Sequence, residues 1–174
     1  YRCLLQMTNK KVLIVFPCHH DIFVFKPYDL LSLKSFIDYV VNINLFEVAI
    51  KYHPRHKSTD SIRFNNNKNV KIFMEDNFDE IIDNYNTIVF FETSTAIIDS
   101  ILKNKLVIYI KGFSFIFNNE FIFKNFINKL PNFDISMHEE VVKYILNEIK
   151  TDPEKKQLLK KYNCELKGDL ALKK

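Results

Sequence analysis

Short apolar runs alternate with amphipathic stretches along the first two thirds of the chain. Residues 12–16 form a continuous apolar run that ends at Pro17, which is the pattern of a strand buried on both faces of a parallel sheet. Similar runs predict four further strands, at residues 47–52, 70–74, 87–91 and 106–110.

Apolar residues at helical spacing separate several of these runs and predict helices. The first helix is indicated by Leu30, Leu33, Ile37, Val40 and Val41. We place its N-cap at Asp29, because a carboxylate there can accept hydrogen bonds from the first N–H groups of the helix. Shorter helices are expected at residues 78–82, opened by Asp76 or Asn77, and at residues 96–102.

Toward the C-terminus the pattern is less regular. The segment at residues 113–126 carries six phenylalanines, which we interpret as a cover for the core; the alternative is an apolar surface that faces another domain or a membrane. A further helix is expected at residues 141–149, and a last one from Asp152 to about Tyr162. Residues 58–69 are polar and rich in Asn, and we expect a loop there.

Strands and helices therefore follow one another in the order β-α-β-β-α-β-α-β, with short connections. This order predicts an α/β fold, a Rossmann-like three-layer domain with a mostly parallel sheet of about five to six strands and helices on both faces. No internal repeat is visible, so residues 1–174 are interpreted as a single domain. Because the chain begins at Tyr1 without an initiator Met, we expect it to be part of a longer protein.

Glycine is scarce, and this scarcity excludes several functions. The sequence contains two glycines, Gly112 and Gly168. A Walker loop needs glycines beside a Lys-Ser/Thr pair, and a dinucleotide-binding fingerprint needs three closely spaced glycines. Any phosphate bound here must therefore be held by a helix N-terminus, by hydroxyl groups or by basic side chains.

Charge and cysteine content narrow the picture further. The 25 Lys and Arg residues exceed the 21 Asp and Glu residues by only 4, and they are scattered, so we expect no nucleic-acid partner. The three cysteines lie far apart, which fits a reducing cytoplasm rather than a disulfide frame. No apolar run approaches the ~18 residues of a membrane span. The excess of Lys and the phenylalanine-rich segment still permit peripheral association with the inner face of the cell membrane.

Ligands of an open α/β sheet bind at the carboxyl ends of its strands, near the point where the strand order reverses. The residues that follow the first four predicted strands are therefore the candidate site, namely 17–21, 53–57, 75–76 and 92–95. Adjacent His19 and His20 on an extended segment point in opposite directions, which makes a poor metal site, so we expect no bound metal. His20 and Glu75 are instead candidate ligand contacts.

The second predicted strand runs into a basic segment. His53 can donate a hydrogen bond to an anionic oxygen, and Arg55 can form a bidentate contact with phosphate or carboxylate. Lys51 lies at the same strand end and is counted with them. Pro54 lacks an N–H group and stiffens the exit from the strand. The alternative interpretation is a solvent-exposed basic loop.

The fourth predicted strand leads directly into a helix through hydroxyl residues. Thr93, Ser94 and Thr95 place hydroxyl groups beside the unpaired N–H groups of that helix, which makes an anion site without glycine. The alternative is simple N-capping by Thr93 or Ser94. Glu92 would repel a phosphate, so we expect it to face a sugar hydroxyl or to cap the helix.

Together these segments resemble the C-terminal, donor-binding half of GT-B glycosyltransferases. The likeness covers about residues 11–165 and is carried by Lys-Tyr-His-Pro-Arg at 51–55, the strand at 70–74, and residues 88–96 with their Glu-Thr-Ser-Thr-Ala end. The chain looks most like bacterial sialyltransferases and polysialyltransferases of surface polysaccharide, capsule or lipooligosaccharide synthesis, which carry a His-Pro and a Ser-Ser/Thr motif. CDP-glycerol glycerophosphotransferases share a related layout.

The resemblance implies an inverting glycosyltransferase that transfers a sugar, in the closest version sialic acid, from a CMP-sugar to a glycan acceptor without a cofactor. His53 would be the catalytic residue, because it matches the histidine that stabilises the departing CMP. Ser94 and Thr95 match the Ser-Ser/Thr motif and would bind the same phosphate or the donor carboxylate. The other donor-binding residues are expected from their positions at strand ends, and they are Lys51, Pro54, Arg55, Glu92, Thr93, Glu75 and His20. The general base belongs to an N-terminal, acceptor-binding half that this sequence lacks.

Two other functions stay open at this point. One is transfer from another donor, of the CDP-glycerol type or with a different nucleotide sugar. The other is a non-catalytic α/β nucleotide-binding module of the flavodoxin-like or receiver-like kind. A receiver would carry clustered Asp residues after its first strand and a Lys after its fifth, whereas here Asp21 stands alone and Lys111 supplies only half of that pattern.

Overall fold

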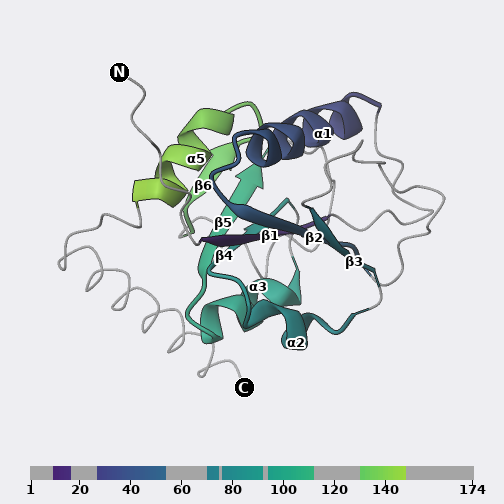
Figure 1. Ribbon diagram of the computed structural model, residues 1–174, viewed down its shortest axis with the longest axis vertical. Coiled ribbons are helices and arrows are strands. Elements are labelled where there is room, and N and C mark those ends of the chain that lie inside the picture. The colour runs from purple at the N-terminus through teal and green to yellow at the C-terminus, as the bar shows by residue number, and fades with distance from the viewer. Residues whose placement is uncertain are drawn as a thin grey trace.

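One open sheet of parallel strands organises the computed structural model (Figure 1). The structure describes residues 10–16, 27–53, 70–74, 76–91, 94–111 and 130–147. Within these ranges the sheet has six strands in the order β3-β2-β1-β4-β5-β6, and every neighbouring pair is parallel. The predicted α/β, Rossmann-like class is therefore confirmed.

The strands coincide with the apolar runs of the sequence. Their bounds are Lys11–Val15 for β1, Glu47–Lys51 for β2, Lys71–Phe73 for β3, Thr87–Phe90 for β4, Leu106–Lys111 for β5 and Asn132–Asp134 for β6. The apolar pattern along the chain indicated the first five strands and missed β6. This edge strand has three residues, and none of them is fully buried, so it leaves no continuous apolar run.

The strand order reverses between β1 and β4. From β1 the chain goes outward through β2 to β3, returns to the other side of β1, and then goes outward again through β4 and β5 to β6. Val12 of β1 lies opposite both Val48 of β2 and Thr87 of β4. The carboxyl ends of β1 and β4 therefore flank the position where open α/β sheets bind their ligands.

Helices cover both faces of the sheet. α1 (Pro27–Asn42) and α5 (His138–Asn147) lie on one face, and α2 (Phe78–Ile82) and α3 (Thr95–Leu102) lie on the other (Figure 1). Among these helices, none combines the length and the hydropathy that a membrane crossing requires.

One predicted helix start is wrong, and for another the structure decides between the two predicted N-caps. Asp29 is not the N-cap of the first helix, because α1 begins at Pro27 and Asp29 lies within its first turn. Proline fits the first helical position, since its ring fixes φ near the helical value and its missing N–H needs no partner there. The N-cap of α2 is Asn77, whose side chain accepts a hydrogen bond from the Asp79 N–H, and not Asp76.

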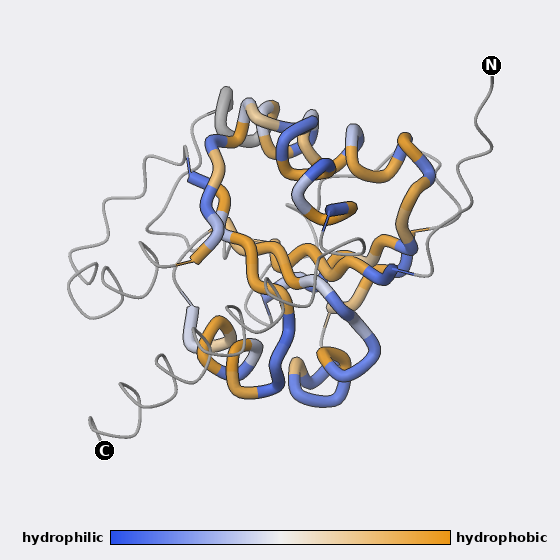
Figure 2. Tube along the Cα trace, turned by 90° about the vertical axis from the view of Figure 1, so that its left-hand side faces the viewer, coloured by the Kyte–Doolittle hydropathy of each residue, from blue (hydrophilic) through white to orange (hydrophobic). Residues whose placement is uncertain are grey.

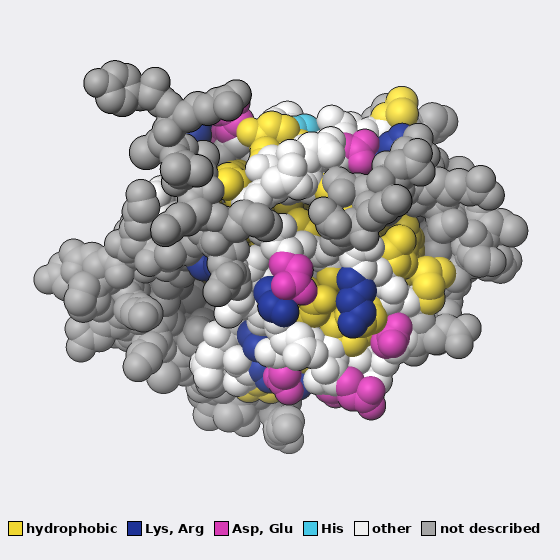
Figure 3. All heavy atoms as spheres, viewed as in Figure 1, with side chains coloured by type: hydrophobic (Ala, Val, Ile, Leu, Met, Phe, Trp, Pro, Cys, Tyr) yellow, Lys and Arg dark blue, Asp and Glu magenta, His cyan; other side chains and the backbone are white. Residues whose placement is uncertain are grey.

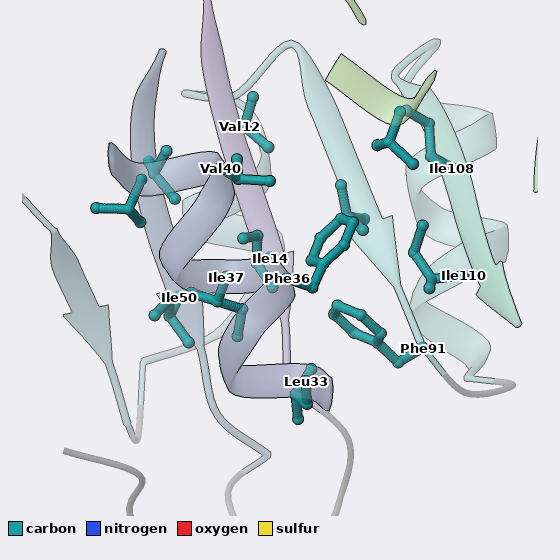
Figure 4. Close-up of a cluster of buried hydrophobic side chains, with 14 of the residues drawn as sticks. Val12, Ile14, Leu33, Phe36, Ile37, Val40, Ile50, Phe91, Ile108 and Ile110 are labelled. Atoms are coloured by element: carbon teal, nitrogen blue, oxygen red, sulfur yellow. The ribbon is translucent and has the colours of Figure 1, made fainter. Parts of the chain in front are cut away.

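The core consists of two apolar layers, one on each face of the sheet. Leu33, Phe36, Ile37 and Val40 of α1 pack onto one face, against side chains such as Ile14 of β1 (Figure 4). Ile81 and Ile82 of α2 and Ile97 and Ile101 of α3 pack onto the other. Figure 2 shows the hydrophobic strands between these two layers of helices.

Several predicted features lie outside the described residues. These are the loop at 58–69, the phenylalanine-rich segment at 113–126 and the helix from Asp152. The helix predicted at 141–149 is confirmed as α5 up to Asn147.

Candidate functional site

The carboxyl ends of four strands, β1 to β4, lie level with one another along one side of the sheet. This row of strand ends is the carboxyl edge. Val15 of β1 lies opposite Lys51 of β2 and Phe90 of β4, and Lys51 lies opposite Phe73 of β3. Two backbone hydrogen bonds continue the sheet one residue further, from the Phe16 N–H to the Lys51 carbonyl at 2.8 Å and from the Tyr52 N–H to the Phe73 carbonyl at 2.9 Å. The backbone is therefore fixed by the sheet up to the residue before His53.

His53 follows this fixed strand end directly. Its side chain is half-buried, so the sheet positions an imidazole at the edge where a ligand would lie. The described chain contains one other histidine, His138 at the start of α5. That ring packs against Phe36 at 5.5 Å and Tyr39 at 5.4 Å between ring centroids, so it belongs to the packing of α1 against α5 rather than to the candidate site.

Lys51 is buried, with 3% of its surface exposed. Its Nζ donates hydrogen bonds to the carbonyl oxygen of Tyr52 at 2.5 Å and to that of Met74 at 2.8 Å. Burial lowers the pKa of the Lys51 amine, while the negative charge of Asp76 acts in the opposite direction. The amine thus ties the exit of β2 to the exit of β3, a role that the sequence did not indicate.

Two aromatic rings close the apolar layer beneath this edge. Tyr52 and Phe16 follow the ends of β2 and β1, are each 1% exposed, and pack with their ring centroids 4.7 Å apart. Burial raises the pKa of the Tyr52 hydroxyl to about 12. No role was predicted for this pair, although the position of each ring just after an apolar strand could have indicated it.

The fourth strand end leads into α3 through Ser94. Ser94 has extended backbone angles (φ −143°, ψ 146°), and its Oγ accepts a hydrogen bond from the Ala96 N–H at 3.3 Å. Ser94 is therefore the N-cap of α3, which confirms the capping interpretation for this residue. Thr95 is the first helical residue and is exposed. The first N–H groups of α3 point out of the helix at the same sheet edge as His53.

The sequence-predicted residues fall into two groups. Lys51, His53, Ser94 and Thr95 are described, and all four lie at the carboxyl edge. His20, Pro54, Arg55, Glu75, Glu92 and Thr93 lie outside the described residues. Because β1 alone separates β2 from β4, the two described parts of the site are about 10 Å apart at the level of their strands.

Charge on the face shown in Figure 3 is mixed rather than concentrated. Lys side chains lie beside Asp and Glu side chains, with hydrophobic side chains between them. Lys11 pairs with Glu47 at 3.0 Å and Lys103 with Asp83 at 3.2 Å. Within the described ranges, no three His, Cys, Asp or Glu residues are placed to hold a metal ion.

The likeness of this chain to known proteins is one of fold and not of sequence. No protein-family model and no curated protein matches the sequence. Among solved structures, the chain resembles the glycotransferase of kitacinnamycin with a TM-score of 0.59 and 10% identity, over 92% of this chain and 40% of that one. It also matches the glycosyltransferase SnogD from Streptomyces nogalater with a TM-score of 0.48 and 9% identity, over 74% of this chain and 32% of that one.

The first of these likenesses defines the class of fold. The six-stranded parallel sheet with helices on both faces is a Rossmann-like architecture, and the kitacinnamycin glycotransferase shares this fold. The chain spans 40% of the length of the kitacinnamycin glycotransferase that it matches.

Proposed function

We propose that this chain is the donor-binding half of a GT-B glycosyltransferase and binds a nucleotide sugar at the carboxyl edge of its sheet. The observation that supports this most directly is the position of His53 and the N-cap of α3. They follow strands β2 and β4, which lie on either side of β1, where the strand order reverses. The Rossmann-like fold, shared with a GT-B glycosyltransferase, supports the same function.

The two parts of the site have complementary roles in this proposal. The N-terminus of α3 attracts the phosphate, because its unpaired N–H groups and the helix dipole both favour negative charge. His53 donates a hydrogen bond to a phosphate oxygen from the other side of β1. A separation of about 10 Å between strands β2 and β4 leaves room for a phosphate between the two groups.

The finer proposal is inverting transfer of sialic acid from a CMP-sugar. The hydroxyl of the glycan acceptor attacks the anomeric carbon, and the bond from that carbon to the phosphate oxygen breaks. The electron pair stays on the phosphate of CMP, where the hydrogen bond from His53 stabilises the new charge. The proton of the acceptor passes to a general base on another part of the enzyme. This version rests on the resemblance of residues 51–55 and 92–95 to the sialyltransferase motifs.

A thermal-shift panel with CMP, CDP, UDP and GDP tests the binding function. We expect the cytidine nucleotides to raise the melting temperature most, since they carry the base of the proposed donor. A preference for UDP or GDP would contradict the CMP-sugar version and leave another nucleotide-sugar transferase. A chain that responds to none of the four nucleotides would contradict the transferase and favour a different α/β module.

Substitution of His53 tests its role in the reaction. In the intact enzyme, His53→Ala should lower turnover by about 100-fold or more, which is typical of a lost electrostatic or acid contact in the transition state. His138→Gln is the control, because the His138 ring is held between α1 and α5 by its contacts with Phe36 and Tyr39, and it should keep its turnover. Near-normal activity of His53→Ala would show that the assignment is wrong.

A further inference from the structure

Lys51 is an unusual residue of the described chain, and the site proposed above does not explain it. It is the one charged residue of the described ranges that is buried. A buried ammonium group costs free energy unless hydrogen bonds compensate it. Here the compensation comes from two backbone carbonyls just after the ends of β2 and β3, at 2.5 and 2.8 Å from Nζ.

The two carbonyls belong to the peptide groups that lead into two candidate site residues. The Tyr52 carbonyl is part of the peptide that joins Tyr52 to His53, and the Met74 carbonyl is part of the peptide that joins Met74 to residue 75. A single amine therefore sets the orientation of both peptides relative to each other. The backbone bond from Tyr52 to Phe73 holds the same pair of strand ends one step before.

We propose that Lys51 is a positioning residue for His53. By holding the carbonyl of Tyr52, its amine fixes the plane of the peptide from which the imidazole departs, so that the imidazole is directed to the ligand edge. Preorganisation of this kind matters because small displacements of a contacting group weaken its interaction strongly. This proposal rests on the role of His53 in the proposed function, and it differs from the sequence-based prediction that Lys51 contacts the donor itself.

Nuclear magnetic resonance of the His53 imidazole separates the two roles of Lys51. In Lys51→Met, which keeps the length of the side chain but loses its donor, the imidazole signals of the free protein should move, and affinity for CMP should fall about tenfold, as for one lost charge-assisted hydrogen bond. Lys51→Arg, which restores N–H donors, should recover part of both. If Lys51 instead contacts the donor, CMP affinity falls while the His53 signals of the free protein stay unchanged, and positioning is contradicted.

Lys103→Met is the matched control. Lys103 also ties two elements together, because its Nζ donates to the Asp79 carbonyl at 2.8 Å and to the Asp83 carboxylate at 3.2 Å. Its loss should lower stability without moving the His53 signals. A shift of those signals as large as that in Lys51→Met would mean that they report general loosening, and would overturn the proposal.

Two other outcomes are covered as well, namely a variant that does not fold and a chain that does not bind CMP. If Lys51→Met does not fold, Lys51→Gln, whose amide is uncharged and one bond shorter than the amine, replaces it: the His53 signals should still move, and unmoved signals would contradict positioning. If the unchanged chain binds no CMP, the CMP-sugar version of the proposed function fails, whereas the His53 signals of the free variants still decide whether Lys51 positions the imidazole.

Discussion

At the scale of single residues, Lys51 at the end of β2 and Tyr52 directly after it bury side chains of opposite polarity. Tyr52 joins the apolar layer beneath α1 and stacks on Phe16, while the amine of Lys51 is held by carbonyl oxygens at the strand exits. The alternation of side chains along a strand explains this separation, because successive residues face opposite sides of the sheet. Burial disfavours the charged form of each side chain. For Tyr52 this effect can be measured as a pH dependence of stability.

The buried Tyr52 should make stability fall in alkaline solution. Its pKa is raised from 10.0 to about 12, so the unfolded chain loses this proton at a lower pH than the folded chain. The contribution is fully present below pH 10 and is lost as the pH rises toward 12, by at most about 2 to 3 kcal/mol. Urea unfolding between pH 8 and pH 12 should give a shallower decline for Tyr52→Phe than for the unchanged chain. A constant offset at every pH would contradict the assignment.

At the scale of elements, α3 shows how a short helix is held at both ends. Ser94 caps its N-terminus. At its C-terminus the N–H of Asn104 donates to the Ile101 carbonyl and the N–H of Lys105 to the Ser100 carbonyl, each at 3.0 Å. This is the pair of bonds of a Schellman motif. Asn104 takes the left-handed position of that motif, with φ 56°.

Glycine usually occupies this left-handed position. Asn44 after α1 also has a positive φ, of 51°. Asparagine tolerates this conformation better than most residues, because its short polar side chain can bond locally. A chain with two glycines in 174 residues thus ends two of its helices with asparagine.

Substitutions at the two ends of α3 separate stability from ligand binding. Ser94→Ala removes the N-cap and should lower the free energy of unfolding by about 1 kcal/mol. Asn104→Ala places a Cβ without a polar side chain at positive φ and should cost about the same. Chemical denaturation measures both losses. Because only Ser94 lies at the carboxyl edge, Ser94→Ala alone should also reduce the thermal shift given by CMP.

The opposite result would be informative for the site. If Ser94→Ala and Asn104→Ala lower the response to CMP equally, then the response follows the stability of α3 and not a contact at its N-terminus. Asn104→Gly, in contrast, should retain or increase stability, because glycine adopts the left-handed conformation without steric cost.

At the scale of the whole molecule, two apolar layers share one sheet, so they should unfold together. Leu33 of α1 and Ile82 of α2 are each 0% exposed and lie on opposite faces. Truncation of either to Ala should lower the free energy of unfolding by about 2 to 5 kcal/mol within a single transition. Leu31 is 68% exposed on the same helix as Leu33, and Leu31→Ala should change stability by less than about 0.5 kcal/mol.

Calorimetry with circular dichroism would check this cooperativity. Two separate transitions, each sensitive to one of the buried substitutions, would show that the faces unfold independently.

Much of the architecture was predictable from the sequence, because the residues of single segments determine it. The buried strand β1 and the apolar stripe of α1 each follow from residues within one segment. β6 was missed, since three partly exposed residues carry no such stripe. The start of α1 was placed three residues late, because the capping ability of Asp29 was weighed above the fit of Pro27 to the first helical position.

The candidate site was predictable in its location and less so in its detail. The rule that ligands bind at strand ends brought His53 and Ser94 to one edge, since it depends only on strand direction. The burial of Lys51 was beyond prediction, because its partners are carbonyls of Tyr52 and of the distant Met74. Backbone partners of that kind leave no signature in the identity of the side chains.

The central place of β1 in the sheet has a consequence for how the protein is made. Among the described strands β1 comes first in the sequence, yet one of its two neighbours is β4, and the Lys11 N–H reaches the Asn86 side chain 75 residues further along. Until Thr87–Phe90 emerge from the ribosome, β1 presents an open, apolar edge to the cell. This sheet must therefore be protected from aggregation until β4 has been made, and its folding rate is limited by long-range pairing.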